Sequence, residues 1–251
     1  NQQSDQQSNQ QRMVRALQAI EKLQDKLAQV EAAKTEQIAI VGMGCRFPGG
    51  AESPDAFWQM LVAEKDALTP VHSARWDADS YYSNDVDTPG KIVTRNGGFI
   101  EHLKNFDADF FGISPREAVS LDPQQRLLLE VSWEAMEQGN IVPADWAGRS
   151  VGVFVGMSSQ DYSQHLSRRA ETEIDAYLAT GNAHSVAAGR LSYTLGFTGP
   201  SLVVDTACSS SLVAVHLACQ SLRNRDCEVA LTGGVNRILA PEFSINFSKA
   251  H

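Results

Sequence analysis

The sequence predicts an α/β domain preceded by a separate amphipathic helix. Short apolar runs at residues 38–41, 151–155, 202–204 and 229–231 alternate with helical stretches. This pattern is typical of strands that are buried on both faces of a sheet and covered by helices. The chain has 251 residues, 43% of them hydrophobic, which is enough to bury a core.

The N-terminal segment changes character near residue 11. Residues 1–10 are rich in glutamine, and we expect them to be disordered. Residues 11–35 contain no glycine or proline and carry an apolar residue at every a and d heptad position. These positions are Met13, Ala16, Ile20, Leu23, Leu27 and Val30. The pattern predicts a docking or coiled-coil helix, about 30 Å long at 1.5 Å per residue. An ordinary helix lying on its own domain is the alternative.

Two further helices and one irregular segment are expected. Residues 120–138 have Pro123 in the first turn and end at Gly139, as helices often do. Residues 209–223 are apolar almost all round, which predicts a buried helix. Residues 66–105 are rich in Asp, Ser, Asn and Gly, which favours a long surface excursion.

The composition argues against several classes of function. Acidic residues outnumber basic ones by 30 to 21, a net charge of −9, which disfavours nucleic acid and anionic membranes as partners. No apolar run approaches the roughly 20 residues that cross a bilayer. The four cysteines form no CxxC pair and have no zinc-type spacing with histidine, so we expect a reduced, cytoplasmic protein without a metal site.

A glycine pair at residues 42 and 44 follows the first apolar run. It superficially matches a dinucleotide-binding fingerprint, but the third glycine is missing and Pro48 interrupts any helix that would follow. We therefore expect a turn at which two backbones pack closely, and no nucleotide site.

The junction around Cys208 carries the strongest chemical signal. An apolar strand at residues 202–204 runs into Cys208 and then directly into the helix at residues 209–223, with small residues on both sides of the thiol. This is the arrangement of a nucleophile elbow, with Cys in place of Ser, and a helix N-terminus favours the thiolate form. The alternative is an inert buried cysteine. Cys45, Cys219 and Cys227 lack this context and are interpreted as structural, and His216 as a hydrogen-bonded core residue.

Residues 205–211, Asp-Thr-Ala-Cys-Ser-Ser-Ser, resemble the active-site motif of the ketosynthase (β-ketoacyl synthase) domains of modular polyketide synthases. Further segments resemble that family in the same order along the chain. They are residues 38–50, 111–118, 121–130, 180–182, 189–193 and 233–236. Residues 37–251 are therefore identified as the N-terminal part of a ketosynthase domain.

The resemblance implies a thiolase-like, layered α/β/α/β/α fold, of which this chain holds the first half. It also implies a homodimer. The heptad helix is then similar to the docking helices of polyketide synthases, which pair and receive the C-terminal docking tail of the upstream synthase polypeptide.

The implied reaction has two stages. Cys208 accepts an acyl chain from the phosphopantetheine of an acyl carrier protein, with its own backbone N–H contributing to an oxyanion hole. A malonyl-type extender then loses carbon dioxide, and the resulting enolate attacks the Cys208 thioester. No cofactor is bound directly, because the carrier protein's phosphopantetheine holds the substrates.

The family also uses two histidines, and both follow the last of the matching motifs. No histidine of this sequence matches either one, so we expect the 251-residue chain alone to make no condensed product. Two alternatives remain open: a docking module that mediates recognition between synthase polypeptides, and a thiolase-superfamily acyltransferase that does not decarboxylate. The heptad helix and the motifs at residues 42–50 and 122–130 argue against the thiolase-superfamily alternative.

Overall fold

The computed structural model describes residues 2–101, 105–167 and 170–250. At its centre is a parallel sheet of strands β3 (Val151–Gly156), β4 (Ser201–Val204) and β5 (Val229–Gly234), with β3 in the middle. Val153 is in register with Ser201 of β4 and with Leu231 of β5. Three of the four strands expected from apolar runs are thus confirmed, and all three run in the same direction.

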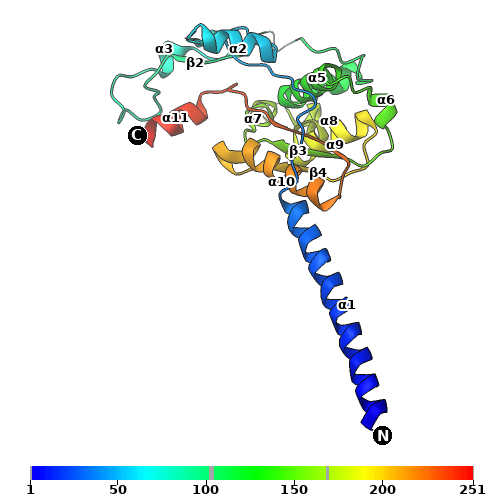
Figure 1. Ribbon diagram of the computed structural model, residues 1–251. Helices are drawn as coiled ribbons and strands as arrows, with labels where there is room; N and C mark the ends of the chain where they lie inside the picture. The colour runs from blue at the N-terminus through cyan, green and yellow to red at the C-terminus, as the bar shows by residue number, and fades with distance from the viewer. Residues whose placement is uncertain (1, 102–104, 168–169, 251) are drawn as a thin grey trace.

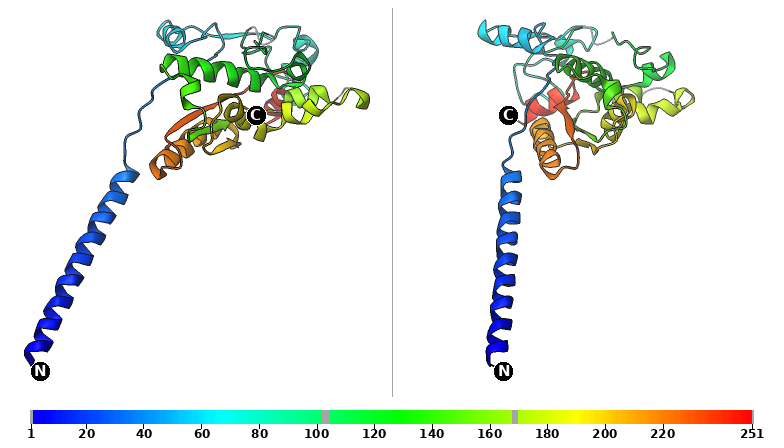
Figure 2. Two further views of the ribbon diagram at one scale, coloured as in Figure 1. Left: turned by 90° about the vertical axis from the view of Figure 1, so that its right-hand side faces the viewer. Right: turned by 45° about the vertical axis from the view of Figure 1, so that its right-hand side comes forward.

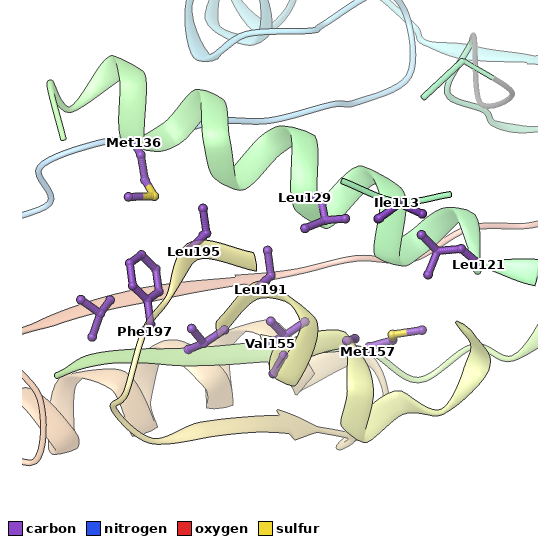
Figure 3. Close-up of a cluster of buried hydrophobic side chains, with 13 residues drawn as sticks. Ile113, Leu121, Leu129, Met136, Val155, Met157, Leu191, Leu195 and Phe197 are labelled. Atoms are coloured by element: carbon purple, nitrogen blue, oxygen red, sulfur yellow. The ribbon is translucent and has the colours of Figure 1, made fainter. Parts of the chain in front are cut away.

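Strand β3 is buried along its whole length because both faces of the sheet are covered. Val151, Val153 and Val155 contribute to one apolar core, whereas Phe154 belongs to a second core on the opposite face. Figure 3 shows the first core between the sheet and helices α9 (His184–Leu195) and α5 (Pro123–Gln138). Helix α10 (Ser210–Asn224) covers the other face. The domain therefore consists of layered helices and a sheet, as the sequence predicts.

Helix α5 begins later than expected. The sequence placed its start near Ser120, but Ser120 ends the separate helix α4 (Pro115–Ser120). The residue before a proline is disfavoured in helical geometry, and Asp122 is accordingly non-helical at φ −55°, ψ 126°. Its carboxylate instead caps α5, because Oδ1 accepts the N–H of Gln124 at 2.7 Å.

Helix α10 is not the fully buried helix that its composition predicted. Its buried positions are small residues such as Ala214 and Ala218, which face the sheet. Leu212 on the other side is 74% exposed, and His216 is exposed rather than hydrogen-bonded in the core. One face of α10 is covered by the sheet, and its other face lies open.

The apolar run at residues 38–41 is extended but forms no strand, so this part of the expectation is wrong. A strand needs a neighbour, and this segment packs against helix α5 instead. A methyl group on Gly44 would lie 2.6 Å from the carbonyl oxygen of Val131, and one on Gly42 would overlap that of Ala135. The expected close approach of backbones at these glycines is therefore confirmed, and the ion pair of Arg46 with Glu134 holds the segment in place.

The expected surface excursion contains short elements only. Strand β1 (Leu68–Pro70) pairs antiparallel with β2 (Asn96–Gly98), and helix α11 (Glu242–Lys249) is tied to the same region because Lys249 Nζ donates to the carbonyls of Val86 and Thr88. The remaining helices are α2 (Pro54–Val62), α3 (Ala78–Tyr81), α6 (Pro143–Trp146), α7 (Asp161–Leu166) and α8 (Ala176–Asn182), with 3₁₀ turns η1 (Glu171–Glu173) and η2 (Ala207–Ser209).

Helix α1 (Gln2–Lys34) projects from the domain as one long rod (Figures 1 and 2). It continues through residues 2–10, which the sequence assigned to a disordered tail. Those residues include no glycine or proline, so nothing local ends the helix. Along the heptad seam, Met13, Ile20, Leu23 and Leu27 are exposed, with Leu23 at 65%, so α1 does not lie on its own domain. The side chain of Val30 is outside the described part.

Helix α1 is also the only element in the described ranges whose length approaches that of a membrane span. Its sequence is too polar for that environment, and no helix among residues 2–101, 105–167 and 170–250 has the length and hydropathy to cross a bilayer.

The packing of α10 on the sheet depends on Gly156 at the end of β3. A methyl group there would lie 2.6 Å from the backbone of Ser210 and Ser211. Gly156→Ala should therefore lower the free energy of unfolding by about 1–3 kcal/mol through overpacking. Urea denaturation of the purified chain measures this value.

Gly189, inside α9, provides the matched control because nothing lies within 4 Å of a methyl group there. Gly189→Ala should raise the free energy of unfolding by about 0.5–1 kcal/mol, since alanine is the better helix former. Equal effects of the two substitutions would contradict the close contact at Gly156.

Candidate active site

Cys208 lies where the carboxyl ends of the three parallel strands meet. Strand β4 ends at Val204, the turn η2 contains Cys208, and α10 begins at Ser210. The strand–turn–helix context expected from the sequence is therefore confirmed. In parallel α/β sheets this edge is where ligands bind, because loops from neighbouring strands converge there.

The turn before Cys208 is held in an unusual backbone conformation. Ala207 has φ +55°, a region that residues with a side chain rarely adopt. Side chains of the same turn fix it: Asp205 Oδ1 accepts the N–H of Ala207 at 3.0 Å. Ser210 Oγ accepts the N–H of Thr206 at 2.9 Å and donates to the carbonyl oxygen of Ala207 at 2.6 Å. The buried hydroxyl of Ser210 thus bridges both sides of the turn.

Two glycines seat this turn directly on the strand ends. A methyl group on Gly234, the last residue of β5, would lie 2.7 Å from Ser211 Cβ, and Gly156 has the even closer relation to α10 described above. The N–H of Val235 donates to the carbonyl oxygen of Gly156 at 3.0 Å, which ties the ends of β3 and β5 together. The first turn of α10 therefore has a fixed position above the sheet edge.

Of the four free cysteines, Cys208 is the exposed one. Cys227 is 5% exposed and packs in the core below α10, with Sγ 3.3 Å from Ser221 Oγ. Burial raises the pKa of the Cys45 thiol, with Arg46 opposing the rise and Glu134 adding to it. The structure therefore rejects the interpretation of Cys208 as an inert buried cysteine and leaves the other three in structural surroundings.

Cys208 lines an open groove of about 2070 Å³. Small-molecule pockets in proteins usually measure roughly 300–1,000 Å³. The groove runs between the residues 36–48 segment, the free side of α10 and strand β5, and much of its lining is apolar, including Ile40 at 80% exposure. Its size and lining suit contact with a polypeptide or a long acyl chain better than an enclosed small-molecule site.

Behind the sheet edge lies a buried polar cluster that the sequence analysis missed. Gln124 Nε2 donates to the carbonyl oxygen of Ser159 at 3.1 Å, and Ser159 Oγ donates to Gln124 Oε1 at 2.9 Å. His184 Nε2 lies 3.1 Å from the same carbonyl of Ser159. Burial raises the pKa of the neighbouring Asp122 carboxyl, although its hydrogen bonds from Gln124 and the positive charge of Arg237 oppose the rise.

A second branch of the same cluster fixes α5 to α9 and α4. Gln125 Nε2 donates to the carbonyl oxygen of Gly181 at 3.0 Å, and Arg190 Nε donates to Gln125 Oε1 at 2.9 Å. Arg190 also pairs with Glu117 at 2.7 Å. Consecutive glutamines in the first turn of an amphipathic helix are the signal that could have revealed this cluster, because one of two neighbouring positions there faces the core and buried polar side chains need partners.

Residues 35–251 match the family described as Beta-ketoacyl synthase, N-terminal domain. The chain belongs to the β-ketoacyl synthase family. It is 53% identical over 215 residues, 85% of its length, to a phenolphthiocerol/phthiocerol polyketide synthase polypeptide of Mycobacterium tuberculosis. A second polypeptide of the same synthase is 50% identical over 224 residues, 89% of the chain. The chain spans only 12% and 14% of these two relatives.

Solved ketosynthase structures share the fold. An oxazolomycin ketosynthase domain from Streptomyces albus matches with a TM-score of 0.78 at 35% identity, covering 84% of this chain and 36% of that one. The ketosynthase from module 6 of the bacillaene synthase of Bacillus subtilis matches with a TM-score of 0.74 at 34% identity, covering 84% of this chain and 34% of that one. These similarities identify the sheet and its helices as the first part of the α/β fold of ketosynthase domains.

The turn that carries Cys208 depends on one hydroxyl. Ser210→Ala should lower the free energy of unfolding by about 1–3 kcal/mol, because the N–H of Thr206 and the carbonyl of Ala207 both lose their buried partner. Chemical denaturation followed by circular dichroism measures the change.

Ser211→Ala is the control, since Ser211 is the exposed next residue of the same helix. Its effect should stay within about 0.5 kcal/mol. A Ser210→Ala variant as stable as Ser211→Ala would show that the hydroxyl does not hold the turn.

Proposed function

We propose that Cys208 is the nucleophile of a polyketide synthase ketosynthase and accepts an acyl chain from the phosphopantetheine thioester of an acyl carrier protein. One observation carries the proposal: Cys208 is an exposed thiol on a strained turn at the N-terminus of α10, above the carboxyl ends of the sheet and facing an open groove. Membership of the β-ketoacyl synthase family supports the reaction type.

In the transacylation step, the thiolate of Cys208 attacks the carbonyl carbon of the acyl thioester. The backbone N–H of Cys208 stabilises the negative charge on the carbonyl oxygen. The carbon–sulfur bond to phosphopantetheine then breaks, and its thiolate leaves and takes up a proton. The acyl group remains on Cys208 as a covalent intermediate, which divides one difficult reaction into two easier steps.

In the condensation step, a malonyl-type extender on a carrier protein loses carbon dioxide, and its enolate attacks the Cys208 thioester. A carbon–carbon bond forms and the Cys208 thiolate is released. The family's two histidines are assigned to no residue of this sequence, so Cys208 is the one catalytic residue in the proposal. The four free thiols fit a reducing compartment, and we place the protein in the cytoplasm.

The transacylation step can be tested by mass spectrometry. When the purified chain is incubated with an acyl thioester, it should gain the mass of one acyl group, and the modified peptide should contain Cys208. Cys208→Ala should abolish the modification. Cys219→Ala, which removes a half-buried thiol from the same helix, should leave it unchanged. Acylation that persists in Cys208→Ala would contradict the proposal.

We further propose that α1 pairs with a second copy of the chain and receives the C-terminal docking tail of an upstream synthase polypeptide. The heptad seam is exposed along the described part of α1, and the helix extends away from the domain, where a partner can reach it. Three heptads give a weak coil, so the ketosynthase domain itself contributes most of the dimer interface.

A charge in the seam tests this second proposal. Leu23→Asp should weaken binding of the upstream tail, and self-association of the chain, at least tenfold, because burying one leucine side chain contributes about 1.5–3 kcal/mol. Gln18→Asp adds the same charge off the seam and should leave both unchanged. Calorimetry with the tail peptide and analytical ultracentrifugation provide the measurements, and equal behaviour of the two variants would contradict docking through the seam.

A further inference from the structure

Arg237 follows strand β5 and is the least satisfied charged side chain in the described part of the chain. It is 7% exposed, and neither its Nε nor its Nη1 has a hydrogen-bond partner. Leaving buried N–H groups of a charged side chain without acceptors is costly, and most native proteins avoid it. An unsatisfied guanidinium at the edge of a groove is therefore a candidate for ligand binding.

The charges around Arg237 are of both signs. Arg75 and Arg126 both repel its charge, and Asp122 is the carboxylate that attracts it. The two neighbouring guanidinium groups already donate to backbone carbonyls: Arg75 to Ile238 and Arg126 to Leu121 at 2.7 Å. The carboxylate of Asp122 is likewise engaged by Gln124. Burial lowers the pKa of Arg237 to about 10, so the side chain remains charged at neutral pH.

An acceptor without a partner belongs to the same region. Asp161 is 4% exposed, and its Oδ2 accepts the N–H of Leu239, two residues beyond Arg237, at 3.0 Å. Its other oxygen, Oδ1, is buried and has no partner. Arg237, Asp161 and Cys208 all line the groove described above. The groove therefore carries both unsatisfied donors and an unsatisfied acceptor on its inner wall.

We propose that Arg237 binds an oxyanion, either a carboxylate or a phosphate, through the N–H groups on Nε and Nη1. The fork of a guanidinium matches two oxygens of either group, and charge-assisted hydrogen bonds of this kind are the strong ones. Asp161 Oδ1 accepts a hydrogen bond from an N–H or O–H group of the molecule that carries the anion. The identity of the natural anion rests on the proposed function, which offers two sources: the carboxylate of the extender and the phosphate of phosphopantetheine.

The competing explanation is structural. In that case Arg237 serves only to balance Asp122 from a distance, and no anion binds. The two explanations predict different behaviour of the Nε–H group of Arg237 when anions are added. An anion that binds there changes the chemical shift of this group, whereas a purely structural guanidinium keeps the same chemical shift.

Nuclear magnetic resonance of the 251-residue chain labelled with ¹⁵N-arginine follows Nε directly. The probes are inorganic phosphate and malonate, each titrated at constant ionic strength with chloride. The Nε–H signal of Arg237, assigned by its loss in Arg237→Gln, should shift and saturate with at least one probe. Because Arg237→Gln lacks the reporting signal, its affinity for the same probe is measured by isothermal titration calorimetry and should be at least tenfold weaker. Arg225→Gln, at an exposed arginine lining the same groove, should bind the probe with unchanged affinity.

The probes separate the two sources. Saturation by phosphate alone assigns the site to the phosphate of phosphopantetheine, saturation by malonate alone assigns it to the extender carboxylate, and both results support an oxyanion site. Absence of a saturating shift with either probe, or equal affinity in Arg237→Gln, overturns the proposal. If Arg237→Gln does not fold, Arg237→Lys keeps the charge but not the fork and should still weaken binding.

Anion binding at Arg237 can be measured whether or not Cys208 is acylated. Cys208→Ala should retain the full affinity for the anion, so a chain that binds anions but is not acylated refutes the proposed function alone. A chain that is acylated but shows no anion-dependent shift refutes the Arg237 site alone.

Discussion

The structure depends on the contact between the first turn of α10 and the glycines that end β3 and β5. Gly156 and Gly234 leave no room for a side chain, so the helix rests directly on the strand ends. This contact sets the height of Cys208 above the sheet and requires a sharp turn after β4. The left-handed Ala207 and the bridging hydroxyl of Ser210 are consequences of that requirement. A strained turn is stable here because packing on three strands determines it.

The two faces of the sheet have different roles. On one face, α9 and α5 form the larger core, and the buried hydrogen bonds of Gln124 and Gln125 fix the start of α5 against the neighbouring loops. On the other face, α10 packs small residues against the sheet and leaves larger apolar residues exposed, of which Val215 lines the groove. The rigid face thus supports the thiol, and the open face leaves the thiol accessible from the groove.

Local features of the sequence were predictable, and features that depend on distant segments were not. The strands at residues 151–155, 202–204 and 229–231 and the turn at Cys208 follow from apolar runs and small residues alone. The run at residues 38–41 has the same composition but no neighbouring strand, and the burial of α10 depends on what covers its second face. The surroundings of Arg237 bring together residues 75, 122, 126 and 161, which no local pattern connects.

The glycine-seated turn leaves Cys208 as the exposed thiol, although all four cysteines line the groove. Competitive alkylation of the folded chain with iodoacetamide, followed by peptide mapping at increasing times, tests this exposure directly. Cys208 should be labelled first, and Cys227, packed beneath α10, should be labelled last. Labelling of Cys45 or Cys219 at the same rate as Cys208, under conditions in which the chain remains folded, would contradict the account.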